Sequence, residues 1–390
     1  MSAQVDRIIR LPKMIDLIWN HTPVCTQTCE ECCVSAVHVV SEGDSARLRD
    51  FVGMDVKIPM AKHETRYQAA QRHLQRLGLE LTYSDKLRVL DHLEGFSCRI
   101  DISGGDALVT PEGLDVLSAT AARIGRDNVT LTITGAGLRT ELVDRVAPCI
   151  SELNFTFNAA TREDAFIRPR GYADINLRLA RRFQEAGVRV RAECPLTSGN
   201  CDPDHLRRLY RVLTEAGVDT LLVMRQFNVG RGALRPEVIP SRDQYLRAIQ
   251  TLREAERTSA GPRIKLQCAL RHLEHQAGAG EAQPNPCDLG TRSYGLMPNG
   301  TLLASPWAYN KSGKPLDPTW VLGNLARQPL RDILLTPKAQ TIIRRADENR
   351  GHCKIFAAEA SRQINPLDRM FDSSDPLYAM PLDAGAGLAA

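Results

Sequence analysis

The middle of the 390-residue chain alternates strand patterns with helix patterns, and this alternation limits the folds that are open to it. Helices are predicted over 110–125, 172–187 and 202–217. Gly187 and Gly217 stand where such helices commonly end, in the position after the last turn. Strands joined through helices run parallel, because a short hairpin connects only antiparallel strands. The alternation therefore predicts an α/β fold with a parallel sheet.

Six strands are predicted for this sheet, over 14–19, 97–108, 128–138, 151–159, 188–196 and 218–227. The middle strands carry apolar residues on one face and polar residues on the other: Arg99, Asp101, Ser103, Thr130, Thr132, Thr134, Asn154, Thr156, Asn158, Arg189, Arg191 and Glu193. A filled barrel is lined by Val, Ile and Leu, so the polar face predicts an open barrel that encloses a ligand. A half-exposed antiparallel sheet is the alternative, and the helices between the strands disfavour it.

The pattern changes after the sixth strand. One more helix is predicted, over 242–256, and the sequence then becomes irregular and rich in Gly and Pro. We therefore expect a barrel domain over 1–235, with an insertion over 34–95 that contains a basic helical stretch. A second region over 236–375 and a disordered tail over 376–390 complete the predicted organisation.

Composition sets the class of protein and its compartment. The net charge of +4 is too small for this length to indicate nucleic acid or a membrane surface as a partner. The N-terminus has no signal-peptide pattern, and no apolar run approaches the roughly 20 residues of a membrane span. We therefore expect a cytoplasmic protein with reduced thiols, in which eleven cysteines do not form a disulfide framework.

Four of these cysteines lie together in "PVCTQTCEECC", residues 23–33, just after the first predicted strand. A zinc site needs a second pair of ligands downstream, and no clear pair follows. A redox C-x-x-C motif uses two cysteines and leaves Cys25 unexplained. Three thiolates on one short loop suit an iron–sulfur cluster with one iron left open to an external ligand. Structural binding of iron–sulfur or zinc, without catalysis, stays open at this point.

The spacing C-x3-C-x2-C of Cys25, Cys29 and Cys32 resembles the signature of the radical S-adenosylmethionine (SAM) enzymes. The resemblance implies a partial (β/α)6 barrel and a [4Fe-4S] cluster held by these three cysteines. It also implies that SAM binds the open iron, and that a flavodoxin or ferredoxin supplies the electron that cleaves SAM to a 5′-deoxyadenosyl radical. Cys33 lies outside the signature, and we interpret it as a buried bystander thiol.

Further motifs support the resemblance in the expected order. "SGGD", comprising Ser103, Gly104, Gly105 and Asp106, follows the second strand, where the family places a Gly-Gly-Glu motif beside the methionyl amine of SAM. Glycines there would let backbone carbonyls approach the ligand. Asn158 stands where the family often places a ribose contact, and "FNVGRG", 227–232, resembles a segment of the peptide-modifying branch. Arg191 and Gln226 complete the candidate SAM contacts. Asp106 replaces the usual Glu, and Glu31 replaces a common aromatic residue near adenine.

The C-terminal region resembles the SPASM extension, which holds auxiliary clusters in peptide-modifying members of the family. Cys287 and Gly300 fit its opening pattern, but Ser305 stands where a second cysteine belongs, and the later group of cysteines is absent. We therefore predict a degenerate extension and a single cluster. Cys268, Cys287 and Cys353 are either ordinary thiols or ligands of a non-standard cluster.

The expected function is hydrogen abstraction from a peptide or peptide-like substrate by a radical SAM enzyme of the oxidoreductase type. Only 24 residues precede Cys25, which leaves no room for a cobalamin-binding or leader-binding domain. A peptide substrate would then need direct capture or a separate precursor-recognition protein. The rival enzyme reading is a free small-molecule substrate whose charges are held by Arg189, Arg191 and Glu193. The catalytic residues and the bond that is formed stay open.

Overall fold

The computed structural model describes residues 9–50, 53–136, 138, 140–160, 172–277, 287–346, 353–361, 365–372 and 374–378. Its main feature is a ten-stranded sheet in the order β11-β10-β9-β8-β7-β6-β1-β12-β13-β14. The strands are β1 (Met14–Thr22), β6 (Ser97–Gly104), β7 (Val129–Ile133), β8 (Glu152–Thr156), β9 (Arg189–Leu196), β10 (Thr220–Arg225), β11 (Arg263–Leu266), β12 (Ser293–Leu296), β13 (Thr301–Leu303) and β14 (Val321–Asn324). All neighbours from β11 to β12 pair in parallel, and β13 and β14 add antiparallel strands.

The six predicted strands are β1 and β6 to β10, so the prediction of a parallel α/β sheet is confirmed. Their apolar faces are buried, as in Leu131, Phe155 and Val190, and polar residues alternate with them. The change of pattern expected near 235 is not the end of the sheet. β11 pairs with β10, and β12 returns to pair with β1. The C-terminal region is therefore built onto both edges of the same sheet.

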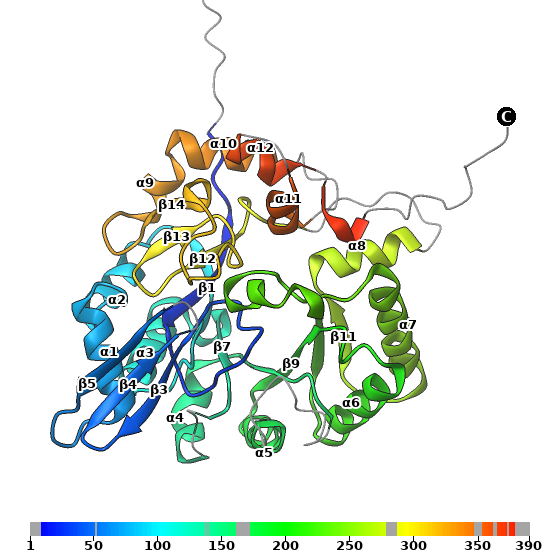
Figure 1. The fold of residues 1–390 in the computed structure, drawn as a ribbon, viewed down its shortest axis with the longest axis horizontal. Helices are drawn as coiled ribbons and strands as arrows, with labels where there is room; N and C mark the ends of the chain where they lie inside the picture. The colour runs from blue at the N-terminus through cyan, green and yellow to red at the C-terminus, as the bar shows by residue number, and fades with distance from the viewer. Residues whose placement is uncertain are drawn as a thin grey trace, which may run out of the picture.

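Twelve α-helices lie in the described residues: α1 (Arg66–Arg76), α2 (Tyr83–Asp91), α3 (Pro111–Ile124), α4 (Val143–Val146), α5 (Tyr172–Glu185), α6 (Pro203–Glu215), α7 (Arg242–Thr258), α8 (Cys268–Ala277), α9 (Leu330–Leu334), α10 (Pro337–Arg345), α11 (Lys354–Ala360) and α12 (Pro366–Phe371). Figure 1 shows α4 to α7 along the outer side of the curved sheet, with α8 and α10 to α12 gathered at one end. Gly187 and Gly217 each have φ of +75°, as expected for residues that close α5 and α6. No described helix is both long enough and apolar enough to span a membrane.

The segment 34–95 contributes three of the four strands of a second sheet, which was not predicted. The strands of this sheet are β2 (Val24–Cys25), β3 (Val37–Glu42), β4 (Ser45–Arg49) and β5 (Asp55–Pro59), in chain order. Gly43, with φ of +62°, lies in the tight turn between β3 and β4. The alternating residues of "VHVVSEGDSARLR" around that turn are the signal of a hairpin. Val39, Leu48 and Leu74 form part of the core between this sheet and α1.

Within the C-terminal region, β12 and β13 form an antiparallel pair joined by a turn in which Gly300 has φ of +82°. The disordered tail was expected to start at 376. Instead Pro376–Tyr378 forms a 3-10 helix with Leu377 buried, and the Tyr378 hydroxyl donates to the Ala269 carbonyl oxygen over 2.6 Å. Residues 379–390 lie outside the described part of the chain.

Candidate active site

A cavity of about 550 Å³ follows the polar face of the sheet from the cysteine loop to the amino-terminal ends of the strands. Eight of the ten predicted site residues line it: Cys25, Cys29, Cys32, Ser103, Gly104, Gly105, Arg191 and Gln226. Polar residues of the sheet, including Asp101, Thr132 and Glu193, line its walls. The predicted open, polar interior is therefore present, and the cysteine loop lies at its C-terminal rim, where parallel α/β sheets commonly bind ligands.

The cysteine loop starts at β2, which pairs with β3 through Val24 and Val37. Cys25 and Cys29 are buried, and Cys32 is partly exposed. Two backbone amides point at thiol sulfurs: Gln27 N lies 3.4 Å from Cys25 Sγ, and Ala36 N lies 3.4 Å from Cys32 Sγ. These amides are donors that would stabilise thiolates.

Electrostatics around Cys25 favour its neutral thiol when no cation is bound. Burial raises the pKa of Cys25 well above its usual value, and the charges of Asp106, Cys32 and Cys29 raise it further. A coordinated cation reverses this effect, because it holds a thiol in its deprotonated form. Among the described residues, no three His, Cys, Asp or Glu side chains converge as ligands of a single ion would. The donor set fits thiolates that each bind a different iron of one cluster.

Arg231 clamps the cysteine loop through its backbone carbonyls. It lies in a 3-10 helix, η4 (Gly230–Leu234), that follows β10, and its side chain is fully buried. Its guanidinium donates to the Cys29 and Ala36 carbonyl oxygens over 2.6 Å each, and its backbone N donates to the Cys32 carbonyl oxygen over 2.8 Å. A side chain on Gly230 would overlap the Cys33 carbonyl and lie 2.8 Å from that of Cys32. The "GRG" motif thus has a local structural reason.

The glycines of "SGGD" have a different reason from the one expected. A Cβ on Gly104 would overlap the Thr22 carbonyl oxygen, and one on Gly105 would overlap that of Val24. The Gly105 and Asp106 amides donate to the same two carbonyls over 2.8 Å. The backbone of residues 104–106 therefore packs directly on the backbone between β1 and the cysteine loop. Both glycines also line the cavity.

Asp106 and Asn158 are not in the cavity lining. Asp106 is fully buried and accepts hydrogen bonds from the hydroxyls of Thr134 at 2.6 Å and Thr26 at 3.4 Å. Asn158 is buried against Tyr172, whose hydroxyl donates to its Oδ1 over 2.5 Å. Cys33, expected to be a buried bystander, is partly exposed and lines the cavity. Glu31 also lines it and is buried.

The charged side chains of the cavity wall pair with one another. Arg191 lies 3.0 Å from Glu152 and 3.1 Å from Glu193. Burial raises the pKa of Glu193, and Arg191 opposes this effect. The Asp101 carboxylate accepts hydrogen bonds from a ring of neutral donors: Thr130, Thr132 and Asn154. Arg189 is mostly exposed, at the outer end of β9.

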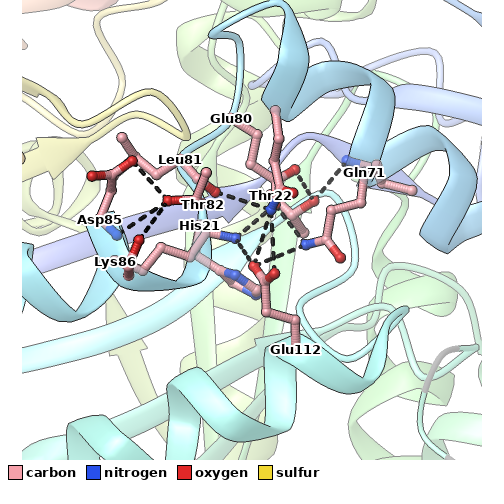
Figure 2. Close-up of polar contacts among 12 residues, drawn as sticks. His21, Thr22, Gln71, Glu80, Leu81, Thr82, Asp85, Lys86 and Glu112 are labelled. Atoms are coloured by element: carbon pink, nitrogen blue, oxygen red, sulfur yellow. Dashed lines mark hydrogen bonds and ion pairs between the residues drawn. The ribbon is translucent and has the colours of Figure 1, made fainter.

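A buried polar network supports the strand that leads into the cysteine loop (Figure 2). The Thr22 hydroxyl donates to Glu80 over 2.8 Å, and the fully buried Lys86 ammonium donates to Glu80 and Glu112 over 2.6 and 2.7 Å. Gln71 also donates to Glu80, over 2.7 Å. The network joins the end of β1 to α1, α2 and α3, so the insertion helps to fix the position of the cysteine loop.

An aromatic wall at the rim was missed by sequence reasoning. Trp307, from the C-terminal region, stacks on Phe227 with ring centroids 4.7 Å apart and an interplanar angle of 7°. Both residues line the cavity. They lie 80 positions apart in the sequence, and "PWAYN" carries no motif that links it to β10.

The comparisons with known proteins concern the fold. No protein-family model matches the sequence, and no curated protein matches it. The structure of Streptococcus suis SuiB bound to S-adenosylmethionine matches with a TM-score of 0.64 and 14% identity, over 93% of this chain and 77% of SuiB. The chain has the radical SAM fold. anSMEcpe with bound AdoMet matches with a TM-score of 0.54 and 15% identity, over 85% of this chain and 80% of that one.

A third structure shows SuiB bound to its precursor peptide SuiA, and it matches with a TM-score of 0.59 and 14% identity. It covers 86% of this chain and 67% of SuiB. The likeness therefore includes the C-terminal region as well as the barrel, as the predicted resemblance to the SPASM branch requires. At 14–15% identity, the similarity to these structures establishes the fold only. Any chemistry has to be inferred from the residues that line the cavity.

Proposed function

We propose that the chain is a radical SAM enzyme that abstracts hydrogen from a peptide or peptide-like substrate. One observation carries the proposal: Cys25, Cys29 and Cys32 lie at the rim of a cavity that is lined by the polar face of the sheet. When bound there, a [4Fe-4S] cluster supplies the electron for reductive cleavage of SAM to a 5′-deoxyadenosyl radical.

The residues of the chain hold and orient the reactants in this proposal. Cys25, Cys29 and Cys32 hold the cluster, and the Gln27 and Ala36 amides stabilise two of the thiolates. Ser103, Gly104 and Gly105 would offer a backbone edge to the methionyl group of SAM, and Gln226 would offer a side-chain amide. The Phe227–Trp307 wall excludes water from the rim, as a radical reaction requires.

Two observations favour a peptide over a small charged molecule. Three of the matching solved structures contain bound peptides: SuiB with SuiA, and anSMEcpe with AdoMet and either of two peptides. In addition, Arg191 and Glu193, which would hold the charges of a small molecule, are paired with each other within the cavity wall. Their charges are compensated before any substrate binds.

Formation of 5′-deoxyadenosine tests the proposal. The protein is reconstituted anaerobically with iron and sulfide and incubated with SAM and a strong one-electron reductant. We expect 5′-deoxyadenosine in the wild type and none in the Cys29→Ala variant. Cys33→Ala, which changes the neighbouring thiol, should keep both iron and product. A reconstituted wild type that holds iron but gives no 5′-deoxyadenosine would support the non-catalytic alternative instead.

The substrate class needs a second measurement. Deuterated peptides encoded near the gene for this chain are added. Mass spectrometry then follows the loss of mass from the peptide and the transfer of deuterium into 5′-deoxyadenosine. Deuterium transfer from a peptide supports the proposal. Transfer only from a free amino acid or metabolite would replace the peptide by the small-molecule alternative.

A further inference from the structure

Three cysteines outside the cavity come together from separate parts of the chain. Cys268 is the first residue of α8, Cys287 precedes β12, and Cys353 precedes α11. The Cys268 and Cys287 side chains hydrogen-bond to each other, and Cys353 lies within electrostatic range of both. Cys353 is buried, whereas Cys268 and Cys287 are partly exposed. Their sequence spacing predicted no such contact.

A buried cation lies beside this pair. Lys354 Nζ is 3.9 Å from Cys287 Sγ, and the lysine is 2% exposed. A buried ammonium needs a negative partner, because its desolvation is otherwise uncompensated. The hydrogen bond from Cys268 and the charge of Lys354 lower the pKa of Cys287 to about 6, and the same contact raises the pKa of Cys268. Cys287 is the better placed of the two thiols to carry a thiolate, because the Lys354 ammonium lies beside its sulfur.

We propose that Cys268 and Cys287 form a redox-active pair that cycles between a dithiol and a disulfide. The proposal is independent of the proposed function, since it requires neither SAM nor a cluster. Ser305 stands at the position expected for a further thiol, and its hydroxyl accepts a hydrogen bond from Trp307 N at 3.3 Å. The three thiols thus lack a fourth soft ligand from this position, and a thiol–thiolate contact is the arrangement that disulfide exchange uses.

The oxidant in this proposal is a low-molecular-weight disulfide of the glutathione class. The Cys287 thiolate attacks one sulfur of that disulfide, its S–S bond breaks, and one thiolate leaves with the electron pair. The Cys268 thiol then loses its proton to the departing thiolate and attacks Cys287 Sγ, which releases the second thiolate. The protein pair loses two electrons, and the small disulfide gains two. The new bond links the first residue of α8 to the residues just before β12.

Redox titration with mass spectrometry tests the pair. The reconstituted protein is equilibrated anaerobically at rising ratios of oxidised to reduced glutathione, alkylated with N-ethylmaleimide and digested. We expect a peptide that joins Cys268 to Cys287 to replace the two alkylated peptides as the ratio rises. If both cysteines stay alkylated at every ratio, or if Cys353 takes the place of either one in the linked peptide, the assignment of the pair is wrong.

Single variants test the roles of the two thiols. Cys268→Ser should leave Cys287 as a mixed disulfide with glutathione, whereas Cys287→Ser should leave Cys268 as a free thiol. Cys149→Ser, at a partly exposed thiol beside Ser118, is the matched control and should leave the linked peptide unchanged. A mixed disulfide on Cys268 in the Cys287→Ser variant would overturn the assignment of Cys287 as the nucleophile.

Iron analysis distinguishes a disulfide-forming pair from thiols that bind a metal. The variant with Cys25, Cys29 and Cys32 all changed to Ala should retain almost no iron after reconstitution, and the wild type should hold about four irons per chain. Iron retained by the triple variant with a cluster-like spectrum, and lost again on Cys287→Ser, would show that these thiols are metal ligands and would overturn the disulfide proposal.

Discussion

Gly105 lies at the proposed contact with SAM and also packs against the backbone of the cysteine loop. Its position in the cavity lining is the one expected for SAM binding, yet a side chain there would first meet the protein backbone. A Cβ on Gly105 would lie 2.8 Å from the Pro23 carbonyl oxygen and overlap that of Val24. The cysteine loop begins at this backbone, so a substitution at Gly105 would also move the cysteines that we propose as cluster ligands.

We therefore predict that Gly105→Ala lowers the iron content of the reconstituted protein as well as its affinity for SAM. Overpacking of this kind costs about 1–3 kcal/mol of folding free energy. Iron analysis and isothermal titration with SAM measure the two effects. Gly187→Ala is the control for space alone, because no atom lies within 4 Å of its Cβ, while its φ of +75° adds a backbone strain that Gly105 does not have. Full iron content with weak SAM binding in Gly105→Ala would show that the side chain meets only the ligand.

His21, near the end of β1, makes the stability of the fold depend on pH. It is completely buried, its Nε2–H donates to the Ala107 carbonyl oxygen over 2.9 Å, and its Nδ1 has no hydrogen-bond partner. Burial, together with the charge of Lys86, lowers its pKa to about 3. The unfolded chain binds a proton on this histidine below a pH of about 6.5, whereas the folded chain resists it down to a pH of about 3.

Stability should therefore fall as pH drops through this window, by up to about 1.4 kcal/mol for each pH unit. We predict that His21→Gln makes the free energy of unfolding less dependent on pH between about 6.5 and about 4.5. Urea denaturation at several pH values measures the slope. His73→Gln, at a partly exposed position on α1, should leave the wild-type slope in place. An unchanged slope in His21→Gln would mean that other groups control acid sensitivity.

At the scale of elements, the segment after β10 acts as a clamp on the cysteine loop. Arg231 contacts the middle of the loop at Cys29 and the chain just after it at Ala36, and no other described hydrogen bond joins these two carbonyls to one side chain. Charge-assisted hydrogen bonds are worth roughly 1.5–3 kcal/mol each, and the two carbonyls would lose both partners together. The clamp thus fixes the geometry in which three thiols are presented to the cavity.

We predict that Arg231→Met lowers the free energy of unfolding by about 3–5 kcal/mol, by leaving two buried carbonyls without these partners. Iron content after reconstitution should fall in parallel, and amide hydrogen exchange over 25–36 should accelerate. Arg231→Lys keeps the charge but cannot bridge both carbonyls, so it should lie between wild type and Arg231→Met. Arg207→Met, at an exposed arginine on α6, is the control. Wild-type exchange in the loop of Arg231→Met would show that β2 and β3 hold it without the clamp.

At the scale of the whole molecule, the C-terminal region is fastened to the barrel by a buried ion pair. Arg225, at the end of β10, lies 2.7 Å from Asp375 at both guanidinium nitrogens, and the two side chains are 2% and 0% exposed. The guanidinium also lies over the Phe356 ring, 3.4 Å from its centroid. Asp375 further accepts a hydrogen bond from Cys353 N over 3.0 Å.

Removal of one partner leaves the other charge buried without compensation, which costs about 3–5 kcal/mol. We predict that Asp375→Ala lowers the free energy of unfolding by about this amount. Urea denaturation measures it. The exposed pair between Arg345 and Asp368 gives the control, because Asp368→Ala should cost at most about 1 kcal/mol. Equal effects of the two substitutions would show that the C-terminal segment contributes little to the folded barrel.

The sequence by itself determined the features that depend on local periodicity and spacing. Alternating apolar residues predicted the six strands, and helices between them required a parallel sheet. The C-x3-C-x2-C spacing predicted three thiols on one loop, and the cavity lining contains all three. The hairpin of β3 and β4 was also readable, from the alternation around Gly43, although it was not predicted.

Only the tertiary structure decided which distant segments meet. Arg231 reaches Cys29 across some 200 positions, Trp307 stacks on Phe227, and Cys268 meets Cys287 beside Lys354. Asn158, by contrast, lies two residues beyond the end of β8 and contacts Tyr172 rather than the cavity. Local propensity and spacing arise from interactions between near neighbours in the chain, so they can be recognised in a sequence. Contacts between distant residues depend on how the segments after β10 pack against the sheet and the cysteine loop, and that arrangement is a property of the packed molecule.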